Sequence, residues 1–275
     1  MGTDRGTGWE LDKREHFDEI VAHYDNIRPG YPDELFADLF AYAGAGPAGK
    51  ALEIGAGTGK ATAPVLRAGY DVTAVEIGAN MADFLRHKFG AQDRFSVVVS
   101  SFEDAPLENS YDLIYAATAF HWVDAAIGCP KAFGLLKSGG VFALLRYNAV
   151  PADGDPLYED IQAVYKEYYY RDKPYRRPES KTDEQYWLPA EIRRGFGFED
   201  MQAYGFADVA MNLYRTARVF SAEEHIALLQ TFSDHRSLPQ SDQTALYAGV
   251  KEAIEKHGGQ LKTEYVYQLY MGRKP

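Results

Sequence analysis

A glycine-rich loop between two apolar runs constrains this chain more than any other feature of its sequence. The segment 50–76, KALEIGAGTGKATAPVLRAGYDVTAVE, reads as a strand, a glycine loop, a helix and a second strand. Glycines let a ligand approach the backbone closely, and the helix that follows exposes unpaired N–H groups at its N-terminus. A unit of this kind belongs to an α/β sheet that binds its ligand beyond the carboxyl ends of the strands.

Two carboxylates flank this loop. Glu76 ends the second strand, about 20 residues after the first glycine, where an acid can accept hydrogen bonds from the ribose hydroxyls of an adenosine. Glu53 precedes Gly55 by two positions, and a carboxylate there suits an amine-bearing ligand and repels a pyrophosphate. Lys60 stands where the dinucleotide fingerprint has its third glycine. The pattern therefore predicts an adenosine-containing cofactor and counts against a dinucleotide.

Composition narrows the classes of partner. The chain has 275 residues and a net charge of −11, with no run of basic residues, which argues against a nucleic-acid substrate and favours a small molecule. Its only cysteine, Cys129, excludes an internal disulfide and a thiolate metal site. The N-terminus is polar and no apolar run has the length of a membrane span, so we expect a cytoplasmic protein, monomeric or homodimeric.

The motif residues Glu53, Gly55, Gly57 and Gly59 resemble motif I of the class I S-adenosylmethionine-dependent methyltransferases. Further segments are similar to a methyltransferase type 11-like subgroup of small-molecule enzymes related to trans-aconitate methyltransferase. They are the AFHW run at 119–122, the LLKSGG run at 135–140 and a leader pattern carried by Phe17, Val21, Tyr24, Arg28, Pro29, Tyr31 and Pro32.

The resemblance implies a set of site residues. Tyr24 and Arg28 would close over the methionine end of the cofactor, and the carbonyl of Ala117 would accept from its amine. Ser101 stands where the family commonly has an aspartate for the adenine amino group. His121 is the first candidate for a general base and Tyr24 the second, and no metal is expected. The implied cofactor-binding set is Glu53, Gly55, Ala56, Gly57, Gly59, Glu76, Ile77, Met81, Ser101, Phe102, Ala117, Tyr24 and Arg28.

The expected fold is a doubly wound, Rossmann-like α/β sheet of seven strands, six parallel and the last antiparallel. N-terminal capping helices occupy residues 1–45, and the S-adenosylmethionine-binding core occupies 46–150. A cap insertion over the substrate spans 151–205. Residues 206–275 complete the core sheet and carry a helical insertion.

Aromatic and basic residues of the insertion are candidates to line a pocket for a flat or anionic acceptor: Tyr165, Tyr169, Arg176, Arg177, Tyr186 and Trp187. Thr231, Ser233 and His235 are further candidates. The predicted function is methyl transfer from S-adenosylmethionine to a small molecule. Two alternatives stay open, which are an NAD(P)-dependent oxidoreductase and a non-catalytic S-adenosylmethionine-binding module.

Overall fold

The computed structural model describes residues 27–44, 46, 48–108, 110–186 and 198–275. Two residues that the sequence marks as site candidates, Tyr24 and Trp187, lie outside the described residues.

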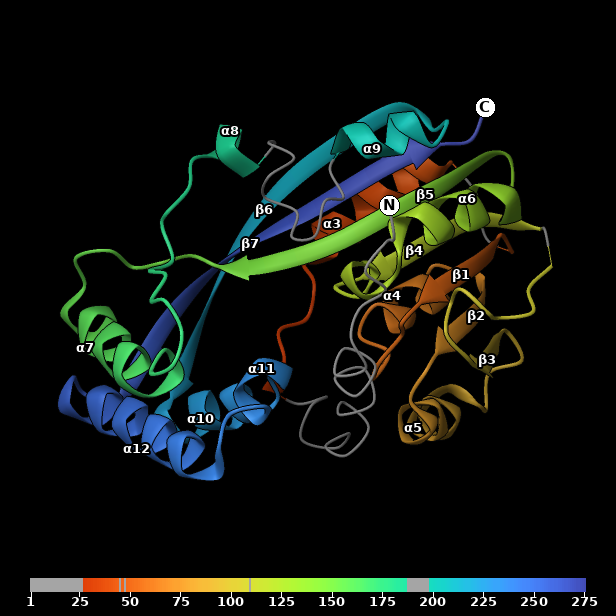
Figure 1. The fold of residues 1–275 in the computed structure, drawn as a ribbon. Helices are drawn as coiled ribbons and strands as arrows, with labels where there is room; N and C mark the ends of the chain where they lie inside the picture. Colours follow the sequence, from red (N-terminus) through yellow and green to blue (C-terminus); the bar gives the residue numbers. More distant parts are fainter. Residues whose placement is uncertain (1–26, 45, 47, 109, 187–197) are drawn as a thin grey trace, which may run out of the picture.

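A single sheet of seven strands organises the chain, in the order β3-β2-β1-β4-β5-β7-β6 (Figure 1). The strands β3, β2, β1, β4 and β5 pair in parallel, whereas β7 runs antiparallel to both β5 and β6. The predicted fold, six parallel strands with the last antiparallel, is therefore confirmed. The strands are β1 (Lys50–Ile54), β2 (Asp71–Glu76), β3 (Phe95–Val99), β4 (Tyr111–Ala117), β5 (Leu136–Ala149), β6 (Ala207–Ser221) and β7 (Gln260–Arg273).

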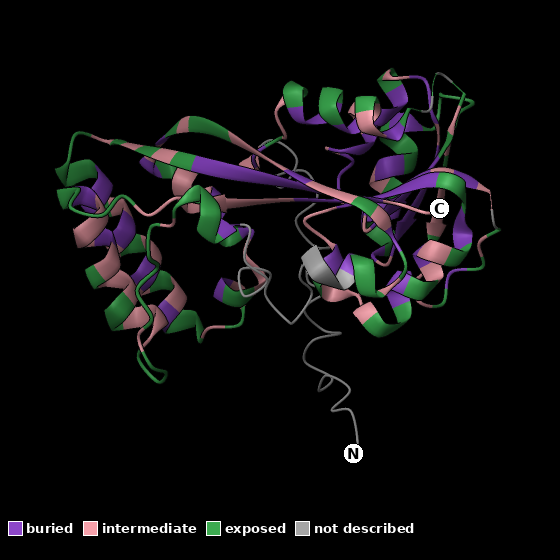
Figure 2. Cartoon of the chain, turned by 90° about the horizontal axis from the view of Figure 1, so that it is seen from above, coloured by how far each residue is buried: buried purple, intermediate pink, exposed green. Residues whose placement is uncertain are grey.

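Helices pack on both faces of the sheet, and the apolar faces of the strands make up the core on each side (Figure 2). Continuous apolar runs such as LEI in β1 and LIYA in β4 fit a sheet that is covered on both faces. The helices and turns of this part are α3 (Asp33–Ala43), α4 (Thr62–Arg67), α5 (Ala79–Phe89), the 3₁₀ turn η2 (Phe120–Trp122), α6 (Ala125–Leu135) and α9 (Phe198–Ala203).

The strands β5, β6 and β7 are much longer than the others, at 14, 15 and 14 residues. Sequence patterning predicts strands at 206–214 and 263–271, so the structure extends both of them. The reason is that β6 and β7 pair continuously from Ala210–Met271 to Ser221–Gln260, and each supplies backbone partners to the other.

The far ends of these long strands carry a separate helical layer, which we call the cap. Its members are α7 (Pro156–Val164), the π-helical turn η3 (Tyr165–Tyr169), α10 (Ala222–Gln230), α11 (Ser233–Arg236) and α12 (Gln240–Lys256) (Figure 1). They share an apolar cluster that includes Leu157, Ile161, Leu246 and Val250. Helices expected in two parts of the chain, 151–205 and 206–275, thus pack into one layer.

The helix α10 begins as the sequence indicates. Ser221 accepts a hydrogen bond from the Glu224 N–H, and the Glu224 side chain accepts one from the Ser221 N–H, a capping box. Within the described ranges, no helix is both long and apolar enough to cross a bilayer.

Candidate functional site

A cavity lies along the carboxyl edge of the parallel strands. Because the strand order there is β3-β2-β1-β4-β5, it runs from the loop after β3 to the end of β5. Arg28, Pro29 and Tyr31, which precede α3, line it as well. Its lining residues are Arg28, Pro29, Tyr31, Glu53, Ile54, Gly55, Ala56, Gly57, Thr58, Lys60, Ala61, Val75, Glu76, Ile77, Met81, Ser100, Ser101, Phe102, Glu103, Ala117, Thr118, Ala119, Trp122, Val123 and Tyr147.

The glycine loop forms one wall of the cavity, and a side chain is excluded from its three glycine positions for different reasons. All three have positive φ, at 66° for Gly55, 55° for Gly57 and 79° for Gly59. A Cβ on Gly55 would lie 2.6 Å from the Cβ of Ala119, whereas a Cβ on Gly57 would meet nothing within 4 Å. The backbone at Gly57 therefore borders open space, where a ligand can approach it.

Glu76 is fixed by the backbone on both of its oxygens. The Gly57 N–H donates to Oε2 at 2.7 Å, and the Gly78 N–H donates to Oε1 at 2.9 Å. Each carboxylate oxygen can accept more than one hydrogen bond, so both can still receive hydroxyl donors. The arrangement presents a preoriented carboxylate to the cavity, as a ribose diol requires.

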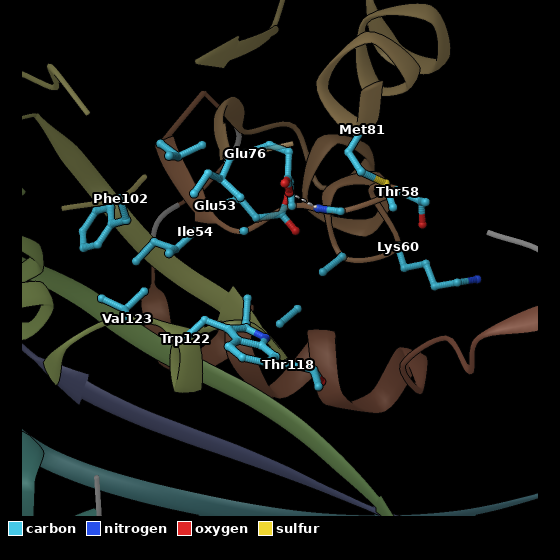
Figure 3. A pocket seen from close by; sticks show the side chains of 18 of the residues that line it. Glu53, Ile54, Thr58, Lys60, Glu76, Met81, Phe102, Thr118, Trp122 and Val123 are labelled. Atoms are coloured by element: carbon cyan, nitrogen blue, oxygen red, sulfur yellow. Dashed lines mark hydrogen bonds between the residues drawn. The ribbon is translucent and has the colours of Figure 1, made fainter. Parts of the chain in front are cut away.

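Glu53 lies deeper, with only 1% of its surface exposed, and points into the same space as Glu76 (Figure 3). The hydroxyls of Thr62 and Tyr115 both donate to its Oε2, at 2.5 and 2.9 Å. The pKa of the Glu53 carboxyl is raised to about 8, mainly by burial; the two hydroxyl donors offset part of the rise, and the nearby Glu76 charge adds to it. A cationic ligand group would favour its charged form.

The loop after β3 forms the opposite end of the cavity, with Phe102 at that end in Figure 3. Ser101 is tied to Asp104, because its hydroxyl donates to Asp104 Oδ2 at 2.7 Å and accepts from the Asp104 N–H at 3.2 Å. The ammonium of Lys131 on α6 donates to the carbonyls of Glu103 and Ala105 at 3.1 and 2.7 Å. The shape of this loop is thus set by contacts outside the cavity.

The loop after β4 and the leader meet at the other end. Thr118 has a φ of 53°, rare for a β-branched residue, and its N–H donates to the Leu145 carbonyl at 2.8 Å. Its hydroxyl lies 2.6 Å from the hydroxyl of Tyr31. The Tyr31 ring stands edge-on to Tyr147 and Tyr267, which holds it in place.

Arg28 lines the cavity, and its guanidinium also binds the cap. Nε donates to the Thr231 hydroxyl at 2.8 Å and Nη2 to the Thr231 carbonyl at 2.9 Å, while Nη1 lies 3.4 Å from the Tyr147 hydroxyl. The guanidinium carbon is 4.4 Å from the centre of the Phe232 ring. Arg28 therefore connects the leader to the junction of α10 and α11.

Most of the predicted cofactor residues meet in this one cavity. Among the described residues of the set, Gly59 does not line the cavity, and a Cβ added there would meet Phe89 at 2.4 Å. Tyr24 lies outside the described residues. Those that line the cavity are Glu53, Gly55, Ala56, Gly57, Glu76, Ile77, Met81, Ser101, Phe102, Ala117 and Arg28.

The catalytic candidate His121 does not reach the cavity. It is exposed, it packs against the neighbouring Trp122 with ring centres 4.9 Å apart, and Trp122 lines the cavity instead. The physical reason is the 3₁₀ turn at 120–122, which points consecutive side chains in different directions.

None of the cap candidates among the described residues lines the cavity. Tyr165 and Tyr169 pack around His235, with ring centres 5.5 and 5.3 Å away, and Arg177 pairs with Glu159 at the surface. Sequence reasoning missed Thr118 and Tyr147 as lining residues, since neither a positive φ nor the extension of β5 is visible in the residue pattern. In the part of the chain that is described, no three His, Cys, Asp or Glu side chains are placed to hold a metal ion.

Comparisons with known proteins agree with this geometry. Residues 52–144 match the family model of the methyltransferase domain. An uncharacterized methyltransferase of Mycobacterium tuberculosis is 36% identical over 130 residues, which is 47% of this chain and 51% of that protein, so the match spans about half the length of the relative. An uncharacterized methyltransferase of Schizosaccharomyces pombe is 27% identical over 87% of each chain.

Among solved structures, Haemonchus contortus phosphoethanolamine N-methyltransferase 2, in complex with phosphomonomethylethanolamine and S-adenosylhomocysteine, superposes with a TM-score of 0.54. The identity is 18%, over 97% of this chain and 59% of that one, so the likeness concerns the fold.

Proposed function

We propose that this chain transfers a methyl group from S-adenosylmethionine to a small molecule, because residues 52–144 match the methyltransferase domain family and line much of the cavity. The observation that carries the proposal is the pair of carboxylates beside the glycine loop. Glu76 is held by the Gly57 and Gly78 N–H groups, and Glu53 is buried next to it. A carboxylate at the position of Glu53 would repel the pyrophosphate of a dinucleotide.

Each part of the cavity fits a part of the cofactor. Glu76 is suited to the ribose hydroxyls, and the loop at Ser101 and Phe102 is suited to the adenine. Glu53 and the Ala117 carbonyl are suited to the amino group of the methionine part. Arg28, expected from the sequence at that same end, has three of its guanidinium nitrogens directed to Thr231 and Tyr147, so we assign it to the connection between leader and cap.

The bound cofactor supplies a methyl group on a sulfonium, and little covalent chemistry is left to the protein. The residues of the chain would position the acceptor in line with that methyl group and exclude water, which provides most of the rate enhancement in such transfers. His121 is exposed outside the cavity, so we do not retain it as the general base. An acceptor that must lose a proton would find the hydroxyls of Tyr31 and Tyr147 at the β5 end.

The acceptor is proposed to be small and oxygen-bearing, within the subgroup related to trans-aconitate methyltransferase. The support is two cations, Arg28 and Lys60, which are among the described lining residues and lie outside the adenine loop, although Glu53, Glu76 and Glu103 line the cavity as well. A carboxylate would be attracted to the two cations and would need no general base, since it is already a nucleophile.

Calorimetric titration with S-adenosylhomocysteine, beside a nicotinamide dinucleotide, tests the proposal. The wild type should bind S-adenosylhomocysteine at micromolar concentrations, and Glu76→Ala should lose at least about tenfold in affinity because the ribose hydroxyls lose their acceptor. Glu252→Ala, an exposed residue of α12, controls for the removal of one negative charge.

The other outcomes separate the alternatives. Binding of the dinucleotide instead would support an oxidoreductase. Binding of S-adenosylhomocysteine without methyl transfer to any of a panel of small carboxylates, alcohols and amines would support a non-catalytic module. Failure of the wild type to bind either ligand overturns the cofactor assignment.

A further inference from the structure

The direction of the cavity determines which of its ends is the reacting end. The ribose carboxylate, Glu76, ends β2, and the adenine loop follows β3 on one side of it. The sheet order β3-β2-β1-β4-β5 then places β1, β4 and β5 on the other side. The sulfur of an adenosine cofactor lies on the opposite side of the ribose from the adenine, so it points toward the ends of β4 and β5.

That end of the cavity contains a pair of hydroxyl groups. The Tyr31 and Thr118 hydroxyl oxygens lie 2.6 Å apart, and both residues line the cavity. Two hydroxyls carry two hydrogens and their mutual hydrogen bond uses one, so lone pairs remain on the oxygens. The pair is a compact, uncharged group with an electronegative surface.

The backbone holds this pair in place at a cost. Thr118 has a φ of 53°, and conformations of this kind persist only where the surroundings over-determine them. Here the surroundings are the bond from the Thr118 N–H to the Leu145 carbonyl and the contact between Ala119 and the loop at Gly55. Ring contacts with Phe36, Tyr147 and Tyr267 fix Tyr31 from the other side. Strain in a β-branched residue at the reacting end points to a role in the site.

We propose that the Tyr31–Thr118 hydroxyl pair contacts the sulfonium end of the cofactor and favours the methylated, cationic form over the demethylated, neutral one. This inference rests on the proposed function and goes beyond it, because it assigns the discrimination between S-adenosylmethionine and its product to two named residues.

The chemistry of the two forms supports the assignment. A sulfonium carries a positive charge that polarises its methyl C–H bonds, and neutral oxygen lone pairs attract such hydrogens weakly. S-adenosylhomocysteine lacks both the charge and the methyl group, so the pair offers it nothing comparable. A carboxylate at this point would bind the cation more strongly, but it would also compete with the acceptor for the methyl group. The two acids that flank the glycine loop have other hydrogen-bond partners. Glu53 accepts from the hydroxyls of Thr62 and Tyr115. Glu76 accepts from the N–H groups of Gly57 and Gly78.

Calorimetric titration of both cofactor forms into five proteins tests this. The proteins are the wild type, Tyr31→Phe, Thr118→Val, the double variant Tyr31→Phe/Thr118→Val and the control Thr118→Ser, which keeps the hydroxyl. In Tyr31→Phe and Thr118→Val, the dissociation constant of S-adenosylmethionine should rise about three- to fivefold, while that of S-adenosylhomocysteine changes less than about twofold. Thr118→Ser should keep the wild-type ratio of the two constants. The double variant should be little worse than either single one, because the two hydroxyls act as a unit.

The ratio of the two dissociation constants distinguishes this role from a structural one. A parallel loss of affinity for both forms, or no change for either, overturns the inference. Should Tyr31→Phe fail to fold in a thermal unfolding control, Thr118→Val alone decides the matter. A wild type that binds neither form contradicts the proposed function itself, which is a different result from an unchanged ratio.

Discussion

The guanidinium of Arg28 donates two hydrogen bonds to Thr231, from Nε to the hydroxyl at 2.8 Å and from Nη2 to the carbonyl at 2.9 Å. The two residues are 203 positions apart in the sequence. Thr231 is 3% exposed and follows the last turn of α10. The contact therefore joins the leader before α3 to the cap, on the side where Tyr147 closes the cavity.

Arg28→Met keeps the apolar stem over Phe232 but removes every donor. It should lower the free energy of unfolding by about 1–3 kcal/mol, since the buried Thr231 oxygens lose a charged partner. Thr231→Val should cost less, about 1 kcal/mol, because the carbonyl still accepts from Nη2. Urea unfolding followed by circular dichroism measures both. Equal stability of Arg28→Met and the wild type would show that the hydrogen bonds from Arg28 to Thr231 make no net contribution to the free energy of unfolding.

Because of Glu53, the stability of the ligand-free protein should fall as the pH rises, which is the opposite of the usual effect of a carboxylate. The folded pKa of Glu53 is raised from 4.5 to about 8, so the folded state binds the proton more tightly than the unfolded state. The resulting stabilisation is fully present below pH 4.5 and is lost as the pH rises through about 8, by roughly 5 kcal/mol in all.

Glu53→Gln has no proton to lose at this site and isolates the effect. Relative to the wild type, it should become progressively more stable between pH 5 and pH 8, as measured by urea unfolding at each pH. A constant difference in stability across that range contradicts the raised pKa.

Two histidines of the cap, the buried His235 and the half-buried His225, should act in the opposite sense. Burial lowers the pKa of His235 from 6.5 to about 4; Asp234 raises it, whereas Lys173 and Arg28 lower it. Burial and the neighbouring His235 likewise lower that of His225 to about 4. Their contribution to stability is present above pH 6.5 and is lost as the pH falls through 4. Replacing His235 by Gln should flatten the loss of stability between pH 6.5 and pH 4, and an unchanged slope would contradict a neutral, buried imidazole.

Gly57 and Gly59 form a matched pair for separating binding from folding. Both have positive φ, but an added Cβ at Gly59 would meet Phe89 and Leu85 at 2.4 and 2.9 Å, while one at Gly57 would enter open space. Gly59→Ala should therefore destabilise the fold by several kcal/mol, on the order of an overpacked core. Gly57→Ala should cost only about 1–2 kcal/mol for its φ but should lose most affinity for S-adenosylhomocysteine, measured by titration. If the loss of affinity is in the same proportion to the loss of stability in both variants, the backbone at Gly57 does not contact the ligand.

The sheet and the cofactor end of the site could be predicted because their signals are local. The spacing from Gly55 to Glu76 fixes a strand, a loop, a helix and a strand, and the structure gives those elements at 50–54, 62–67 and 71–76. Glu53 and Glu76 meet beside the loop because the carboxyl ends of parallel strands share one edge.

The reacting end could not be predicted in the same way. Thr118 acquires its role from a backbone torsion, and His121 lies outside the cavity because of a three-residue turn that puts Trp122 in its place. Tyr147 joins the site because β5 continues to Ala149, with Tyr265 of β7 as the backbone partner of that last residue. Each of these depends on contacts between segments far apart in the chain, which periodicity does not record.

The long strands have a consequence for how such proteins can diversify. The cap is built from two separate segments of the chain, one between β5 and β6 and the other between β6 and β7. Helices from both segments share the apolar cluster around Leu157 and Leu246. A recombination event that swaps only 150–205 would pair half of one apolar cluster with half of another. A stable chimera therefore needs coordinated exchange of both segments, so two distant stretches of the gene must be inherited together to keep one apolar cluster intact.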